Sequence, residues 1–166
     1  PHTIDEGKQK KKHKTLSPEK IALKLAQAKA ESVAKKYPKN IVRGSDQVLI
    51  FQEKIFNKAK SRDEGIKNLE MFSGKEHNLI SATYIVKKNK HIWSTTTKAT
   101  IKLRTLDKKE ILDYSTKNPK TLLETVGGYK IEDDKLKCIK LIAGTREDVM
   151  GFPIKGFINK KIEKKK

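Results

Sequence analysis

The spacing of apolar residues along the chain predicts an alternation of helices and strands. Residues 17–36 carry an apolar stripe at helical spacing, and this helix starts at Ser17, a capping residue followed by proline and glutamate. Lys29 lies four residues from both Leu25 and Val33, so it falls on the inward stripe. A lysine on an inward face needs an anionic partner or a path along which its amine reaches solvent.

Shorter apolar runs predict strands, and two pairs of consecutive strands form tight hairpins. After the first helix, the predicted elements are strands at 48–51, 54–56, 77–86, 92–103 and 137–143, helices that start at Ser61 and Asp107, and a last helix near Ile154. Because hairpins interrupt the alternation, the sheet cannot be purely parallel. We therefore expect an α/β fold: a single domain over residues 1–159 with a mixed, twisted sheet flanked by helices, and a basic tail at 160–166.

The charge balance is strongly basic, with a net charge of +19. Such an excess is typical of nucleic-acid-binding proteins, because lysine and arginine neutralise phosphates. Only four of the 39 basic residues are arginine, however, and aromatic residues make up 6% of the chain. Base readout favours arginine and single-strand binding favours aromatic platforms. The lysines are spread along the whole chain, with clusters at residues 8–14 and 160–166, and this favours a genome-wide codon bias toward AT-rich triplets. A non-catalytic basic protein that binds nucleic acid is kept as the alternative function.

Nothing in the sequence indicates a membrane or secreted protein. No apolar run approaches the ~20 residues that a membrane-spanning helix needs, and no signal peptide is recognisable. The single cysteine, Cys138, lies in an alternating apolar run, which predicts a small buried residue and not a nucleophile. We expect a cytoplasmic protein without a membrane partner.

Asp46 is the first candidate for chemistry. It follows a short apolar run, at the predicted end of a strand, where open α/β sheets bind their ligands. A carboxylate there can hold a divalent cation or activate a water, although composition alone favours an ordinary turn aspartate. His77, at a strand start, could be a base, but a structural hydrogen bond is favoured. The common phosphate-binding glycine loops and the HExxH and CxxC motifs do not occur in the chain.

Taken in order, a series of short motifs resembles the Maf family of nucleotide pyrophosphatases. Each motif is weak by itself, but the series covers nearly the whole chain in the family's order. The matching motifs are Ile4-Asp5-Glu6, Leu25 to Ala30, Gly44-Ser45-Asp46-Gln47-Val48, Asn57-Lys58-Ala59, Ser73-Gly74-Lys75-Glu76-His77, Leu103 to Leu106, Gly127 to Glu132, and Val149 to Pro153.

This resemblance implies an α/β fold with a nucleotide cleft, a homodimer, and hydrolysis of nucleoside triphosphates to monophosphate and pyrophosphate with Mg2+ or Mn2+. It implies that the substrate is a modified or non-canonical nucleotide. It also implies roles for six residues: catalysis by Asp46, metal binding by Glu6 and Asp46, and substrate or phosphate binding by Lys29, Gln47, Lys58 and Glu132.

The particular residues in these motifs indicate which nucleotide the resemblance implies as substrate. The run Gly-Ser-Asp-Gln, together with Glu132, is similar to the branch that cleaves 7-methyl-GTP, whereas the dTTP and UTP branch reads Gly-Ala-Asp-Thr. The family's Ser-x-Ser-Pro-Arg-Arg turn, whose amides and arginines would bind phosphates, would lie before Pro1. We therefore expect the 166-residue chain by itself to be nearly inactive. A degenerate member that binds nucleotide without turnover is a further alternative.

Overall fold

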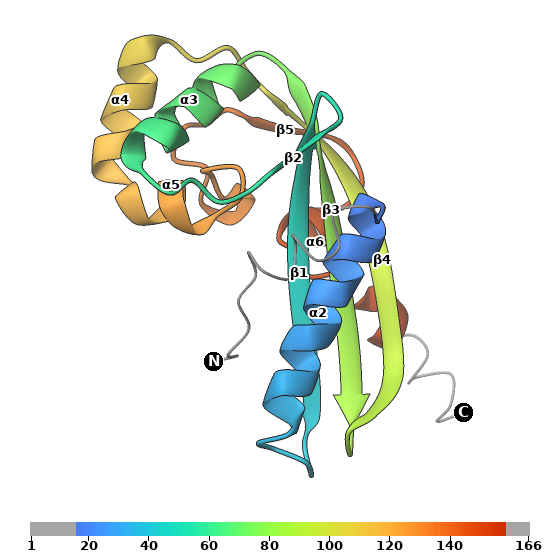
Figure 1. Ribbon diagram of the computed structural model, residues 1–166. Coiled ribbons are helices and arrows are strands. Elements are labelled where there is room, and N and C mark those ends of the chain that lie inside the picture. Colours follow the sequence, from blue (N-terminus) through green and yellow to red (C-terminus); the bar gives the residue numbers. More distant parts are fainter. Residues whose placement is uncertain (1–15, 159–166) are drawn as a thin grey trace. The chain divides into compact units, whose positions relative to one another are not determined.

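The computed structural model describes residues 16–158 (Figure 1). Its elements are α2 (Pro18–Ala34), β1 (Ile41–Phe51), β2 (Lys54–Phe56), α3 (Arg62–Phe72), β3 (Glu76–Lys87), β4 (Lys90–Leu103), α4 (Lys108–Lys117), α5 (Pro119–Glu124), the 3-10 helix η1 (Ile131–Asp133), β5 (Ile139–Ala143) and α6 (Arg146–Val149). A five-stranded sheet is combined with helices, so the predicted α/β class is confirmed. None of the helices in the described residues has the length and apolar character required to cross a bilayer.

The sheet has the strand order β2-β1-β3-β4-β5. The hairpin pair β1–β2 is antiparallel, and so is the pair β4–β5. The turn between β1 and β2 is formed by Gln52 and Glu53, which have φ of 48° and 62°. The second hairpin joins β3 to β4, and its turn is formed by Lys88 and Asn89, which have φ of 50° and 57°. Positive φ at both central positions gives the turn the twist of the flanking strands. Both predicted hairpins are therefore confirmed.

The predicted helix starts are also confirmed, because each starting residue caps its helix. The side chains of Ser17, Ser61 and Asp107 accept hydrogen bonds from backbone amides in the first turns of α2, α3 and α4. Two short helices were not predicted. Proline at the first position starts α5, and a capping box between Thr145 and Asp148 starts α6.

The described chain forms two compact units. The first contains the described residues up to Gln47, Ile80–Thr97, and the described residues from Gly151 onward, while the second contains Val48–Leu79 and Lys98–Met150. Strands β1, β3 and β4 run through both units. The second unit has a core built on large side chains that include Phe72, Ile101 and Leu122, whereas alanines of α2 pack against the strands in the first.

Candidate functional site

Helix α2 approaches strand β1 unusually closely, and a glycine makes this possible. A Cβ atom added at Gly44 would lie 2.1 Å from the carbonyl oxygen of Ala26 and 2.6 Å from the amide nitrogen of Ala30, both backbone atoms of α2. The helix presents Ala22, Ala26 and Ala30 as fully buried residues on one stripe. Figure 1 shows α2 running along β1. Small side chains on the helix and no side chain at Gly44 therefore let the two backbones touch.

The close approach brings together two of the site residues predicted from the sequence. The Nζ of Lys29 lies 2.6 Å from Oδ1 of Asp46, and their side chains are only 14% and 5% exposed. Side chains alternate along a strand, so Asp46 is on the same face of β1 as Gly44 and points toward α2. The inward lysine thus has an anionic partner, and the buried carboxylate has a compensating cation.

Asp46 differs in position from what the local sequence predicts. We expected it after a strand end, and the structure places it inside β1, which begins at Ile41 and continues without a turn to Phe51. The strand continues because the polar side chains of residues 45–47 find partners on neighbouring elements of the first unit. These partners are distant in sequence, so the local sequence by itself predicts a turn at such a polar run.

The opposite face of β1 is held to strand β3 by two hydroxyl contacts. Ser45 Oγ lies 3.3 Å from Thr83 Oγ1, and the Nε2 of Gln47 donates to Ser81 Oγ at 2.9 Å. Ser81 and Thr83 are fully buried, where a hydroxyl needs a hydrogen bond. The residues on both sides of Asp46 are therefore fixed. Ser81 and Thr83 were not predicted from the sequence, although two hydroxyl residues two positions apart in an apolar strand are a signal of such contacts.

The segment that follows α6 lies beside the same face of β1. A Cβ atom added at Gly151, where φ is +75°, would lie 3.6 Å from Nε2 of Gln47. The guanidinium carbon of Arg43 is 3.3 Å from the ring centroid of Phe152. Gln47, which we predicted to contact substrate, thus has Ser81 on one side and the backbone of this segment on another.

The other predicted site residues belong to the second unit or lie outside the described residues. Lys58 is exposed between β2 and α3, and Glu132 is exposed in η1. Both have solvent-facing charges that a ligand could reach. Glu6, a predicted metal ligand, lies outside the described residues. The structure therefore brings Lys29 and Asp46 together, with Gln47 next in the chain.

The segment that carries Glu132 is anchored in the second unit by two tyrosines. The ring of Tyr129 is buried and its hydroxyl forms a short hydrogen bond with Nε2 of His77, while Tyr114 donates to the carbonyl of Gly128 at 2.8 Å. Burial lowers the pKa of His77 from 6.5 to about 4 and raises the pKa of Tyr129. A buried imidazole with so low a pKa, bonded to Tyr129, is a weak base, which agrees with the structural role favoured for His77.

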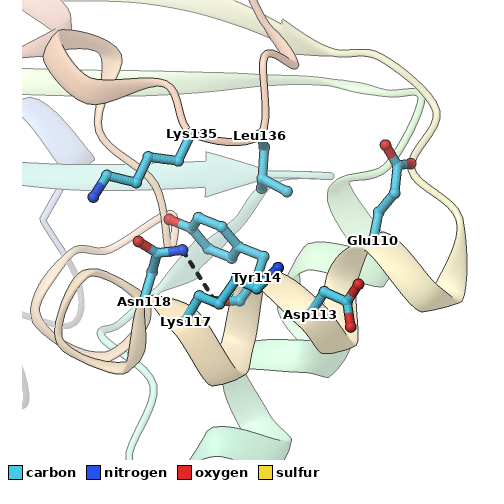
Figure 2. Close-up of a pocket in the computed structure, with 7 residues that line it drawn as sticks. All are labelled: Glu110, Asp113, Tyr114, Lys117, Asn118, Lys135 and Leu136. Atoms are coloured by element: carbon cyan, nitrogen blue, oxygen red, sulfur yellow. Dashed lines mark hydrogen bonds between the residues drawn. The ribbon is translucent and has the colours of Figure 1, made fainter.

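One surface hollow of about 480 Å³ lies in the second unit (Figure 2). Side chains of α4 and its C-cap, among them Tyr114 and Asn118, face Lys135 and Leu136 across it. Its charged residues are mixed in sign, and none of the residues predicted to bind nucleotide lines it. The hollow therefore gives no reason to move the candidate site away from Lys29 and Asp46.

The described side chains bear on whether the site could bind a metal ion. Across residues 16–158, no group of three or more His, Cys, Asp or Glu side chains could hold a metal ion. A site made by protein side chains alone is thus not formed by these residues. Mg2+, however, is commonly bound by one or two carboxylates together with substrate phosphates and waters. Asp46 fits that second arrangement.

Comparisons with known proteins find similar sequences over most of the chain. A family model described as "Maf-like protein" matches residues 1–160. A protein named nucleoside triphosphate pyrophosphatase from Ruegeria pomeroyi is 31% identical over 142 residues, which cover 86% of this chain and 71% of the relative. A protein named 7-methyl-GTP pyrophosphatase from Bartonella henselae is 32% identical over 152 residues, covering 92% of this chain and 77% of the relative. A nucleoside triphosphate pyrophosphatase from Rhodopseudomonas palustris is 31% identical over 159 residues, 96% of this chain and 79% of the relative.

Proposed function

The chain belongs to the Maf family, and from this premise we propose that it is a nucleoside triphosphate pyrophosphatase. It hydrolyses its substrate to nucleoside monophosphate and pyrophosphate. The observation that carries the proposal is the buried ion pair between Lys29 and Asp46, within the motifs that gave the resemblance. Burial of a carboxylate and an ammonium costs desolvation free energy that their pairing offsets only in part. Such pairs are common at functional sites, so this pair is a candidate for chemistry.

In the proposed reaction, a water molecule attacks the α-phosphorus of the triphosphate. A bond forms between the water oxygen and the α-phosphorus, the bond from the α-phosphorus to the bridging oxygen breaks, and pyrophosphate leaves with the electron pair. The Asp46 carboxylate accepts the proton of the attacking water. The Lys29 ammonium, 2.6 Å from Oδ1, holds that carboxylate in place and offsets the negative charge that develops on the phosphates.

Metal dependence is part of the proposal. Asp46 would hold Mg2+ or Mn2+ together with the triphosphate oxygens, and Glu6 is proposed as a further ligand. When bound there, the cation would offset the negative charge of the triphosphate and of the leaving pyrophosphate. Lys58 is proposed to contact phosphate, because it is exposed and can extend its amine toward an anion.

We propose a modified guanine nucleotide such as 7-methyl-GTP as the preferred substrate class. Methylation at N7 places a positive charge on the purine, which a carboxylate attracts, and Glu132 offers an exposed carboxylate. The edge of guanine also presents N–H groups that can donate hydrogen bonds to a carboxylate. The protein from Bartonella henselae supports this choice through its name. The homodimer and the cytoplasmic location stay predictions.

The second candidate function, binding of nucleic acid, is favoured by one observation, the net charge of +19. Counterion release makes such binding fall steeply with salt. The test compares the two directly: the protein is mixed with nucleoside triphosphates and Mg2+ and assayed for pyrophosphate, and separately titrated with duplex and single-stranded nucleic acid at several salt concentrations. Pyrophosphate release supports the enzyme, and its absence together with salt-dependent binding supports the alternative.

A further inference from the structure

Ser81 is a polar residue in a buried, apolar stretch of strand β3. It lies on β3 between Ile80 and Ala82, it is fully buried, and its hydroxyl accepts a hydrogen bond from Nε2 of Gln47 at 2.9 Å. A buried hydroxyl must be bonded within the protein, since its transfer from water otherwise costs free energy. The serine is therefore matched to the side chain of Gln47.

Gln47 is the residue that follows Asp46, and its amide nitrogen donates a hydrogen bond to Ser81. A Cβ atom added at Gly151 would lie in ordinary van der Waals contact, 3.6 Å from the same nitrogen. The positive φ of Gly151, +75°, favours glycine at this position. In the structure, the amide nitrogen is thus held at Ser81.

We propose that Ser81 is a positioning residue that sets the base preference of the nucleotide site through Gln47. This inference rests on the proposed function and on the role in substrate binding that the resemblance to the Maf family implies for Gln47. An amide carries a hydrogen-bond acceptor and a donor at two ends of similar shape, and a half-turn of the group exchanges them. With its nitrogen bound to Ser81, the amide presents a single donor–acceptor pattern. A ligand with the matching pattern binds, and one with the reversed pattern leaves polar groups unpaired.

The neighbouring contact between Ser45 and Thr83 supplies an internal control. It joins the same two strands, also by a hydroxyl, at 3.3 Å, and Thr83 is as buried as Ser81. It does not involve an amide. If hydroxyl contacts between β1 and β3 serve only to hold the strands together, losing either contact should have the same kind of effect.

The experiment uses Ser81→Ala and Thr83→Val in the otherwise unchanged protein. It measures kcat/KM and Kd for GTP, 7-methyl-GTP and UTP, together with the melting temperature. In Ser81→Ala, the ratio between the best and the worst nucleotide should fall by about three- to tenfold, the change expected from losing one ordinary hydrogen bond. Thr83→Val should lower the melting temperature and leave the ratio unchanged.

A second pair of variants separates positioning from general loosening. In a Gln47→Met background, adding Ser81→Ala should have no further effect on the ratio, because the serine acts through the amide. The inference is overturned if Ser81→Ala keeps the ratio while the melting temperature falls, or if it changes the ratio equally in the Gln47→Met background.

Failure of the proposed function gives a different result. A parent protein that binds these nucleotides but releases no pyrophosphate contradicts the hydrolase, and the Kd ratios still test Ser81. A parent protein that binds none of the three overturns both proposals.

Discussion

The Nζ of Lys29 lies 2.6 Å from Oδ1 of Asp46, across the contact between α2 and β1. The two residues are 17 apart in sequence, and the contact depends on Gly44, where the backbones of the helix and the strand touch. Any side chain at Gly44 would push the lysine and the aspartate apart. The glycine thus acts on the chemistry of the site through packing alone.

Gly44→Ala should therefore destabilise the protein and weaken the site. The added Cβ would overlap two backbone atoms of α2, at 2.1 and 2.6 Å, and backbone cannot move aside as a flexible side chain can. We expect a loss of at least about 2 kcal/mol in the free energy of unfolding, as for other overpacked sites. Urea unfolding measures this loss, with Ile41→Ala, at an exposed position on the opposite face of β1, as the control. A Gly44→Ala protein as stable as the parent would show that α2 does not lie against β1 as described.

Removal of Lys29 should take from the buried Asp46 carboxylate the ammonium that lies 2.6 Å from its Oδ1. Lys29→Met is expected to cost about 3 kcal/mol of stability, the lower end of the range for breaking a buried ion pair. Adding Asp46→Asn should restore most of that loss, because the remaining amide is neutral. Lys58→Met, at an exposed position, serves as the control and should leave stability nearly unchanged. Additive losses in the double variant would contradict the pairing.

Glu132→Gln should change the base preference more than the rate for the best substrate. Glu132 is exposed in η1, so its replacement should leave stability unaltered, while the loss of a charge weakens the attraction for the cationic ring of 7-methyl-GTP. Measurements of kcat/KM for 7-methyl-GTP and GTP test this. An equal loss for both nucleotides would place Glu132 among the metal or phosphate ligands.

The stability of the protein should fall in mild acid because of His77. Burial lowers the pKa of its imidazole from 6.5 in the unfolded chain to about 4 in the folded state, so between these values the unfolded state binds more protons. The contribution of neutral His77 is therefore complete above pH 6.5 and is lost as the pH falls toward 4. We expect a loss of about 2 kcal/mol between pH 6.5 and 4.5. His77→Phe should remove this part of the pH dependence, and an unchanged slope would contradict the assignment.

Local sequence signals predicted most of the elements, and the reason is that these signals act over a few residues. Ser61 caps α3 and Asp107 caps α4 through bonds to amides three residues away, and Gln52 with Glu53 forms a two-residue turn. The helical phase of Lys29 likewise indicated an inward charge that needs a partner.

What the local sequence could not predict depends on contacts between distant segments. Asp46 was expected near a strand end, and it lies within β1 because Lys29 on α2 accommodates its charge. Ser81 and Thr83 were missed, since their partners on β1 are more than 30 residues away, with separations of 34 and 38. The roles of Asp46, Gln47, Lys58 and Glu132 in the reaction stay predictions.

The most direct test of the central claim identifies the products formed from a nucleoside triphosphate. The protein is incubated with 7-methyl-GTP or GTP and Mg2+, and monophosphate, diphosphate, pyrophosphate and orthophosphate are quantified, with Asp46→Asn as the matched variant. We predict equal amounts of nucleoside monophosphate and pyrophosphate, and a loss of roughly 1,000-fold or more in rate in a stably folded Asp46→Asn, as expected when a catalytic base is neutralised. Release of diphosphate and orthophosphate, or unchanged turnover in Asp46→Asn, would contradict the account.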